Sequence, residues 1–228
     1  RQRRPQVMGD GLQQRRLQPV ALPGDLGCLR CGRQAIVIES LALAAFVNGE
    51  ERLVDYGVVN GRVFVNNVAL GVYAAIVDQE GYREAKISTT LELLPTLIER
   101  EGPWFDLQFD VPEHGHVDET ALLLVSNNPY ASGTSVNQRS SLAGGELGVI
   151  TINPERVSDL VAITVAAAAG RPETAKAFWS WSTPELTVES NETEIVAGIA
   201  GATVSLTPPL EVRIVTDAAR VLVPPGTR

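Results

Sequence analysis

Residues 54–74 read VDYGVVNGRVFVNNVALGVYA, and their pattern decides the fold class of the chain. The pair Asn60-Gly61 separates two apolar, partly alternating runs, residues 53–59 and 62–68. Asn-Gly favours a type I′ turn, because both of its residues tolerate a positive φ. The stretch therefore predicts a β-hairpin at the start of a β-rich region.

The rest of the chain continues this pattern of short strands. Strands are predicted at residues 105–111, 121–126, 147–152, 186–189, 194–197, 203–206, 210–215 and 221–223. Helices are predicted at residues 36–46, 88–100 and 154–169, with Gly170 ending the last, and residues 175–181 read as a short helix or turn. Many short strands with few helices favour an α+β fold dominated by an antiparallel β-sandwich. We expect an irregular leader and helix over residues 1–50 and the sandwich over residues 51–228.

Composition narrows the class of partner. The formal net charge is -8, which argues against a general nucleic-acid binder. Residues 1–33 are instead basic, with seven Arg and two Asp. This basic segment is compatible with contact to acidic lipid or a polyanion, or with a disordered or foreign leader.

Cysteine and histidine usage does not predict a metal site. Cys28 and Cys31 form a single CLRC pair, whereas a structural zinc site needs about four ligands. His114 and His116 lie far along the chain in PEHGHVDE, which reads as a solvated turn between strands. No apolar run approaches the ~20 residues of a membrane span. We expect a cytoplasmic protein, with peripheral membrane contact as an open alternative.

Several collinear motifs resemble the diacylglycerol kinase and sphingoid-base kinase family, and bacterial diacylglycerol kinase-like proteins most closely. They are residues 54–74, Ser126-Asn127-Asn128-Pro129-Tyr130, Gly144-Gly145-Glu146-Leu147 and Ala219-Arg220-Val221-Leu222-Val223-Pro224, and the similarity spans residues 41–226. The resemblance implies a β-sandwich that packs across a cleft from an α/β nucleotide-binding domain. It also implies ATP and Mg²⁺ as cofactors and a lipid hydroxyl as phosphoryl acceptor.

The nucleotide-binding part of that family matches poorly here. Only Gly9, Asp10 and Gly11 resemble its Gly-Gly-Asp-Gly-Thr phosphate loop, with Met8 and Leu12 at positions where the family has Gly and Thr. Residues 1–50 are therefore interpreted as a truncated remnant of the nucleotide-binding domain. Whether residues 1–33 are native, truncated or frameshifted is left open.

The stretch GIAGATVSL, residues 198–206, contains the clearest departure from the family. It resembles a Gly-x-Asp-Gly-Glu turn whose two carboxylates serve metal-assisted phosphoryl transfer. Gly198 and Gly201 are kept, but Ala200 and Ala202 stand at the Asp and Glu positions. Methyl groups cannot ligate Mg²⁺ or accept a hydroxyl proton. A second departure is Gly144, which stands where relatives often have an Asp in a structural metal loop.

Four asparagines are candidate cleft residues. Asn66 and Asn67 either face the interdomain cleft or satisfy backbone groups at a strand end. Asn127 and Asn128 either line the lipid or nucleotide side of that cleft or belong to a turn stiffened by Pro129. Trp179 and Trp181 are interpreted as core or sheet-covering residues, with a lipid surface as the alternative.

The resemblance predicts a lipid kinase-like protein that is weakly active or inactive as written. A lipid substrate or membrane surface is the expected partner, with a homodimer as a further option and no nucleic acid. The alternative is a non-enzymatic β-sandwich that binds lipid or oligomerises through exposed strand edges.

Overall fold

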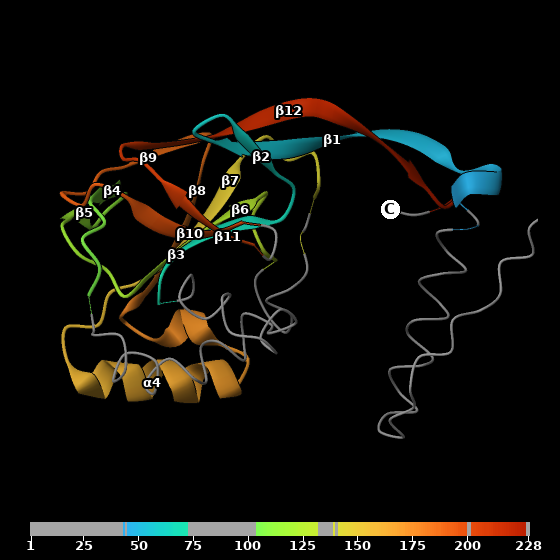
Figure 1. Cartoon of the computed structure of the whole chain (residues 1–228). Coiled ribbons are helices and arrows are strands. Elements are labelled where there is room, and N and C mark those ends of the chain that lie inside the picture. The colour runs from blue at the N-terminus through green and yellow to red at the C-terminus, as the bar shows by residue number, and fades with distance from the viewer. Residues whose placement is uncertain are drawn as a thin grey trace, which may run out of the picture.

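The computed structural model describes residues 43, 45–72, 104–131, 139, 141–199 and 202–226. Within them, two antiparallel sheets lie face to face, and helix α4 (Val157–Ala168) covers the outer face of the larger sheet (Figure 1). The fold class predicted from sequence, α+β with a dominant antiparallel sandwich, is confirmed.

The smaller sheet has four strands in the order β2-β1-β12-β9. Their bounds are β1 Glu50–Val59, β2 Arg62–Phe64, β9 Glu185–Val188 and β12 Leu210–Val223. Strands β1 and β12 pair from Glu50↔Val223 to Val59↔Val212 and form a long ribbon that extends beyond the rest of the sandwich (Figure 1). The register of this ribbon shifts between Val54 and Tyr56, where the single residue Asp55 of β1 lies opposite residues 216–218 of β12, so the bulge is on β12.

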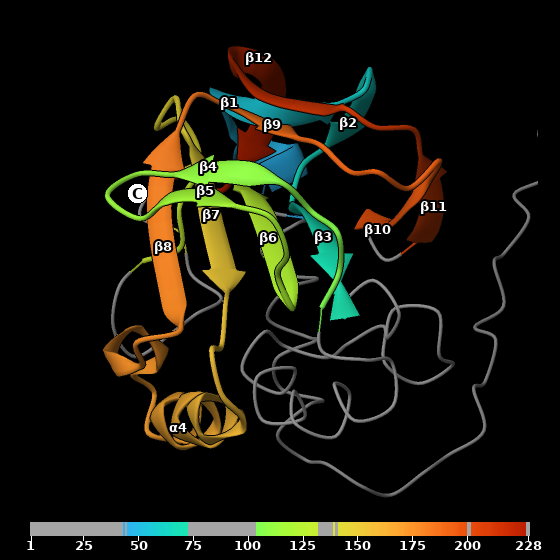
Figure 2. The same ribbon diagram turned by 90° about the vertical axis from the view of Figure 1, so that its left-hand side faces the viewer.

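The larger sheet has six strands in the order β11-β10-β3-β6-β7-β8. Their bounds are β3 Asn67–Gly71, β6 Leu122–Asn127, β7 Leu147–Ile152, β8 Phe178–Thr183, β10 Ile195–Ile199 and β11 Ala202–Leu206. A separate hairpin, β4 (Phe109–Val111) and β5 (Gly115–Val117), crosses in front of β7 and β8 (Figure 2). The short helix η1 (Pro172–Thr174) leads from α4 into β8.

Alternate residues of the larger sheet point into two separate hydrophobic cores, one on each face. Leu123 and Val125 of β6 join the core between the sheets, while Leu122 and Leu124 join the core beneath α4. Helix α4 contributes Ile163 to the second core, together with residues one turn to either side of it. Because successive strand residues point to opposite faces, the six-stranded sheet is buried on both sides where β6 lies.

Local signals fix the first hairpin and the helix end as predicted. Asn60 and Gly61 both adopt positive φ, 45° and 78°, between β1 and β2. Gly170, with φ 72°, follows the end of α4 and donates its backbone N–H to Ala167. At the other end, the Asp159 carboxylate accepts the backbone N–H of Arg156 at 2.9 Å and caps the helix.

Three predicted elements are corrected. Residues 62–68 do not form one strand, because the chain leaves the smaller sheet after Phe64 and enters the larger sheet at Asn67. The short helix or turn predicted over residues 175–181 is right only for the turn at 176–177, because β8 begins at Phe178. Residues 210–215 and 221–223 belong to one strand, β12. The predicted helix at 88–100 and most of that at 36–46 lie outside the described residues.

Candidate functional site

A buried carboxylate anchors the site. Asp55, 2% exposed, accepts the backbone N–H of Asp217 on Oδ1 at 3.0 Å and that of Gly145 on Oδ2 at 2.8 Å. Its own backbone N–H donates to Leu142 at 2.8 Å, and its carbonyl accepts Nδ2 of Asn127 at 2.9 Å. Asp55 thereby ties β1 to the bulge in β12, to the loop before β7 and to the end of β6.

The amides at the end of β6 extend this network. Nδ2 of Asn127 also donates to the Val65 carbonyl at 3.3 Å. Oδ1 of Asn128 accepts the backbone N–H of Gly144 at 2.7 Å, and its Nδ2 donates to Oδ1 of Asn127 at 3.3 Å. Both side chains are almost fully buried, so their hydrogen bonds replace water that has been excluded.

Arg139 joins the second pair of asparagines to the first. Its Nε donates to the Asn127 carbonyl at 2.7 Å, and its Nη2 donates to the carbonyl and Oδ1 of Asn66 at 2.9 and 2.7 Å. The guanidinium carbon lies 4.7 Å from the ring centroid of Tyr130, within cation–π range. The Tyr130 hydroxyl in turn accepts Nδ2 of Asn67 at 3.1 Å.

The four predicted cleft asparagines thus lie in one place. We call this group, with Asp55, Tyr130 and Arg139, the amide cluster. It occupies the end of the larger sheet where β3 begins and β6 ends, beside Asp55 of β1. The amides of Asn127 and Asn128 bind backbone groups and each other, which is a structural use. The exposed Asn66 accepts from Arg139, and Asn67 donates to the Tyr130 hydroxyl. Tyr130 ends the Ser126–Tyr130 motif that the sequence linked to the cleft, whereas Arg139 was not predicted as a site residue and no sequence motif marks it.

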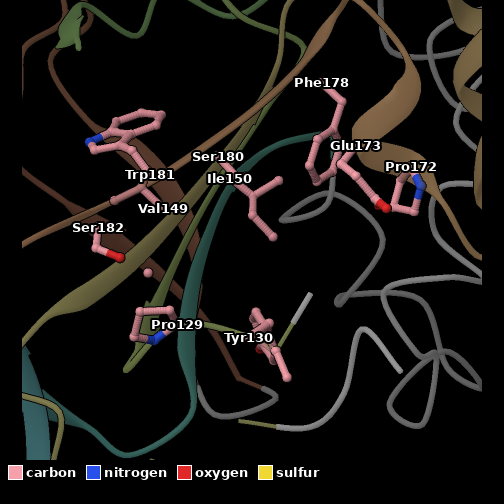
Figure 3. A pocket seen from close by; sticks show the side chains of 12 residues that line it. Pro129, Tyr130, Val149, Ile150, Pro172, Glu173, Phe178, Ser180, Trp181 and Ser182 are labelled. Atoms are coloured by element: carbon pink, nitrogen blue, oxygen red, sulfur yellow. The ribbon is translucent and has the colours of Figure 1, made fainter. Parts of the chain in front are cut away.

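A small pocket opens beside the amide cluster. It encloses about 210 Å³ and shares Tyr130 with the cluster. Ile150, Phe178 and Trp181 supply apolar surface, and Ser180 and Ser182 supply hydroxyls along β8 (Figure 3). The pocket therefore combines an apolar lining with a few polar groups, which is the usual composition of a small-molecule site.

The glycine turn predicted from GIAGATVSL is only partly described. Gly198 is buried in β10 and pairs with Ala69 of β3 and Thr203 of β11. Ala202 begins β11 with an exposed methyl group and pairs with Ile199. Ala200 and Gly201 lie outside the described residues, as do Gly9, Asp10 and Gly11.

The described residues do not fit a magnesium centre. Among them, no group of three or more His, Cys, Asp and Glu side chains is placed to hold a metal ion. The buried carboxylate beside the loop before β7, that of Asp55, accepts backbone N–H groups on both oxygens. A hard cation needs free oxygen ligands, and that carboxylate is committed elsewhere.

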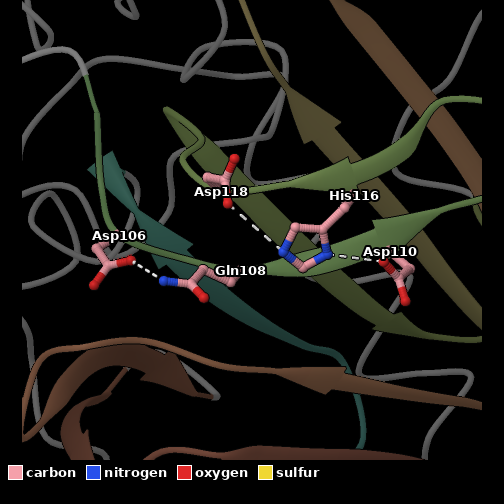
Figure 4. A network of polar contacts seen from close by, with 5 residues as sticks. All are labelled: Asp106, Gln108, Asp110, His116 and Asp118. Carbon is pink, nitrogen blue, oxygen red and sulfur yellow. Dashed lines mark hydrogen bonds and ion pairs between the residues drawn. The ribbon is translucent and has the colours of Figure 1, made fainter.

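Among the described residues, the clearly perturbed ionisable groups lie on and beside the β4–β5 hairpin (Figure 4). A hydrogen bond to Asp110, at 2.8 Å, raises the pKa of His116, and the charges of Asp110, Asp118 and Glu189 act in the same direction. Hydrogen bonds from Gln108 and the backbone of Asn191 lower the pKa of Asp106. His114 is exposed in the turn, as predicted, whereas His116 is exposed but belongs to strand β5.

Solved structures with the same fold are known. One is "a putative diacylglycerol kinase from Bacillus anthracis str. Sterne", with 18% identity and a TM-score of 0.56, covering 78% of this chain. A second structure of such a protein from that strain has 16% identity and a TM-score of 0.59, covering 80% of this chain. The present chain spans 59% and 61% of those two chains. No protein-family profile and no curated protein matches the sequence.

The comparison confirms the diacylglycerol kinase-like fold that the sequence motifs predicted. In the part of the chain that is described, no helix is both long enough and apolar enough to cross a bilayer. The arrangement as a whole is a polar cluster at one end of a doubly covered sheet, with a small mixed pocket beside it.

Proposed function

We propose that the chain is the β-sandwich part of a diacylglycerol kinase-like lipid kinase, a class that transfers the γ-phosphoryl group of ATP to a lipid hydroxyl. The observation that carries the proposal is the fold, which matches two such structures over about four fifths of the chain. Fold alone does not assign a reaction, so the reaction must also be supported by the residues of the site.

The pocket beside the amide cluster supports a lipid ligand. Its volume of about 210 Å³ is below the ~300–1,000 Å³ of pockets that enclose a drug-sized molecule, so it suits part of a lipid. The Tyr130 hydroxyl and the serines of β8 would face the polar part, and Ile150 and Phe178 the apolar part. Chemistry of this kind recognises a glycerol-like headgroup with the first carbons of its chains.

We further propose that the chain as written transfers phosphate weakly or not at all. ATP-dependent transfer to a hydroxyl needs a base to accept the proton and a cation to neutralise charge on the phosphoryl group. Ala200 and Ala202 stand where the family places carboxylates for these tasks. ATP and Mg²⁺ are thus cofactors of the class, and this chain lacks the groups that would engage the metal at that turn.

The test compares the chain with a variant that restores both carboxylates. Wild type, Ala200→Asp/Ala202→Glu and the uncharged control Ala200→Asn/Ala202→Gln are each joined to an intact nucleotide-binding domain of a diacylglycerol kinase and incubated with labelled ATP, Mg²⁺ and diacylglycerol in mixed micelles. We expect phosphatidate only from the acidic variant, at a rate clearly above the amide control. Robust transfer by wild type would overturn the inactivity. A folded acidic variant that matches the amide control would count against the lipid kinase assignment.

A non-enzymatic binding module is the second candidate, and the sheet edges favour it. Within the described residues, β8 and β11 end the order of the six-stranded sheet and each pairs on one side only. Such edges offer unpaired backbone groups to a second chain or copy. Flotation with diacylglycerol vesicles in the absence of nucleotide, together with sedimentation to fix the oligomer, separates this function from the kinase.

A further inference from the structure

A second pocket also lies along β8; it shares Glu173, Phe178, Ser180 and Trp181 with the first pocket, but Tyr130 of the amide cluster does not line it. It encloses about 400 Å³ between the β4–β5 turn and β8, two segments that Figure 2 shows side by side. Its lining includes Phe178, Trp179 and Trp181 from the strand, and Glu113 and His114 from the turn. We call it the tryptophan pocket.

The aromatic side chains of the tryptophan pocket are held in fixed positions. The Trp179 indole N–H donates to the Lys176 carbonyl at 2.9 Å, and the His114 ring stacks on this indole with centroids 4.2 Å apart. Trp181 stacks against Phe109, with centroids 6.3 Å apart. The indoles are thus rigid and half-buried, so a ligand that uses them pays little to order them.

The tryptophan pocket is lined by carboxylates and by no Lys or Arg among the described residues. Glu113 from the hairpin turn and Glu173 from η1 bring two carboxylates to its lining. Because the Trp179 N–H is already used by a backbone carbonyl, that indole offers no donor to an anion. Carboxylates beside aromatic rings attract a positively charged ligand with apolar substituents.

Glu113 also occupies a backbone position that disfavours it. Its φ is 66°, in the left-handed region that glycine adopts without strain. A glutamate there costs stability that a glycine at the same position would not.

We propose that the tryptophan pocket binds a small organic ammonium ion, with a trimethylammonium group as the best match. Quaternary ammonium groups are the ligands for which indole and phenyl surfaces flanked by carboxylates are suited, since they carry charge on a weakly hydrated, apolar surface. The same chemistry occurs in a free choline-type ion and in a phosphatidylcholine headgroup. Binding of an ammonium ion in the tryptophan pocket depends neither on the amide cluster nor on phosphoryl transfer.

The test titrates the chain with choline chloride and with 3,3-dimethylbutan-1-ol, an uncharged molecule of the same shape. Binding is followed by tryptophan fluorescence and by calorimetry. Two of the three tryptophans line the pocket, and Trp104→Phe removes the third as background. We expect choline to bind at least about fivefold more tightly than the alcohol. Equal affinities, or no binding of choline at about 100 mM, would overturn the proposal.

Variants separate the carboxylates from the fold. Glu113→Gly removes a charge and relieves the backbone, so we expect unchanged or higher thermal stability with choline affinity lowered about three- to tenfold. Glu173→Gln should lower affinity by a similar factor. Undiminished affinity in both variants would contradict the proposal. Vesicles of phosphatidylcholine and of phosphatidylglycerol then identify the source: retention by the first alone indicates a headgroup, and retention by neither indicates a free ion.

Discussion

The Asp55 carboxylate holds the backbone N–H of Gly145 at 2.8 Å, although 90 residues separate the two in sequence. The same carboxylate holds the backbone of Asp217 on the neighbouring strand. One buried side chain thus fixes the relative positions of β1, β12 and the loop that leads into β7. The amide cluster is built on this arrangement.

Replacing Asp55 tests how much the site depends on it. Asp55→Asn retains one acceptor oxygen, so one of the two backbone N–H groups loses its partner. A buried donor without a partner costs about 1–3 kcal/mol, and we expect that loss in the free energy of unfolding measured by urea denaturation. Glu146→Gln is the matched control, because Glu146 follows Gly145 in the loop before β7 and is exposed. Equal stability of both variants would show that the Asp55 contacts are dispensable.

We expect Arg139 to stabilise the amide cluster through the planar arrangement of its guanidinium donors, and not through its charge alone. Lysine cannot donate simultaneously to the carbonyls of Asn66 and Asn127 in this geometry. We expect Arg139→Lys to lower the free energy of unfolding by about 1–2 kcal/mol. Amide resonances of the amide cluster should shift in the NMR spectrum. Arg62→Lys, at an exposed position of β2, should do neither; an unshifted spectrum for Arg139→Lys would argue that the fork is not formed in solution.

Gly57 has no room for a side chain. A Cβ there would overlap the ring of Phe64, which is 1% exposed in the core between the sheets. Gly57→Ala should therefore destabilise the protein by about 1–3 kcal/mol through overpacking. The double variant Gly57→Ala/Phe64→Leu should recover part of that loss when both are measured by thermal unfolding. Additive losses would mean that the two positions do not clash.

His116 gives the β4–β5 hairpin a dependence on pH. Its pKa is raised above the ordinary value of 6.5, chiefly by its hydrogen bond to Asp110. The imidazolium therefore contributes stability below that ordinary value, and the contribution is lost as pH rises through the folded pKa. An NMR titration should place the His116 transition above the ordinary value of 6.5, and Asp110→Asn should lower it. A wild-type transition that Asp110→Asn leaves unchanged would remove the basis for this dependence.

Local chemistry was enough to predict some elements of the fold. The strands at Leu147–Ile152 and Leu122–Asn127 are continuous apolar runs buried on both faces, and they were predicted within one residue of their bounds. The hairpin at Asn60-Gly61 follows from two residues that tolerate positive φ. In each case the deciding interaction lies within a few positions along the chain.

The errors arise where tertiary contacts decide. Residues Thr216, Asp217 and Ala218 are polar or small and look like a break between strands. Asp55, remote in sequence, binds the Asp217 backbone and lets β12 run through. Residues 175–181 contain Ala and Lys, which favour helix, yet pairing with β7 makes Phe178–Thr183 a strand. Arg139 reaches the amide cluster only through folding, so no local pattern identifies it.

The β1–β12 ribbon has a consequence for biosynthesis. Glu50 pairs with Val223, so β1 can pair with β12 only after β12, far downstream in the sequence, has left the ribosome. Until then, β2 is the strand that pairs with β1. Closure across so many intervening residues is slow, because the entropy of the loop is lost before the contact is gained. The nascent chain therefore leaves one edge of β1 exposed until β12 emerges, and a holdase chaperone that binds β1 should raise the yield of folded protein.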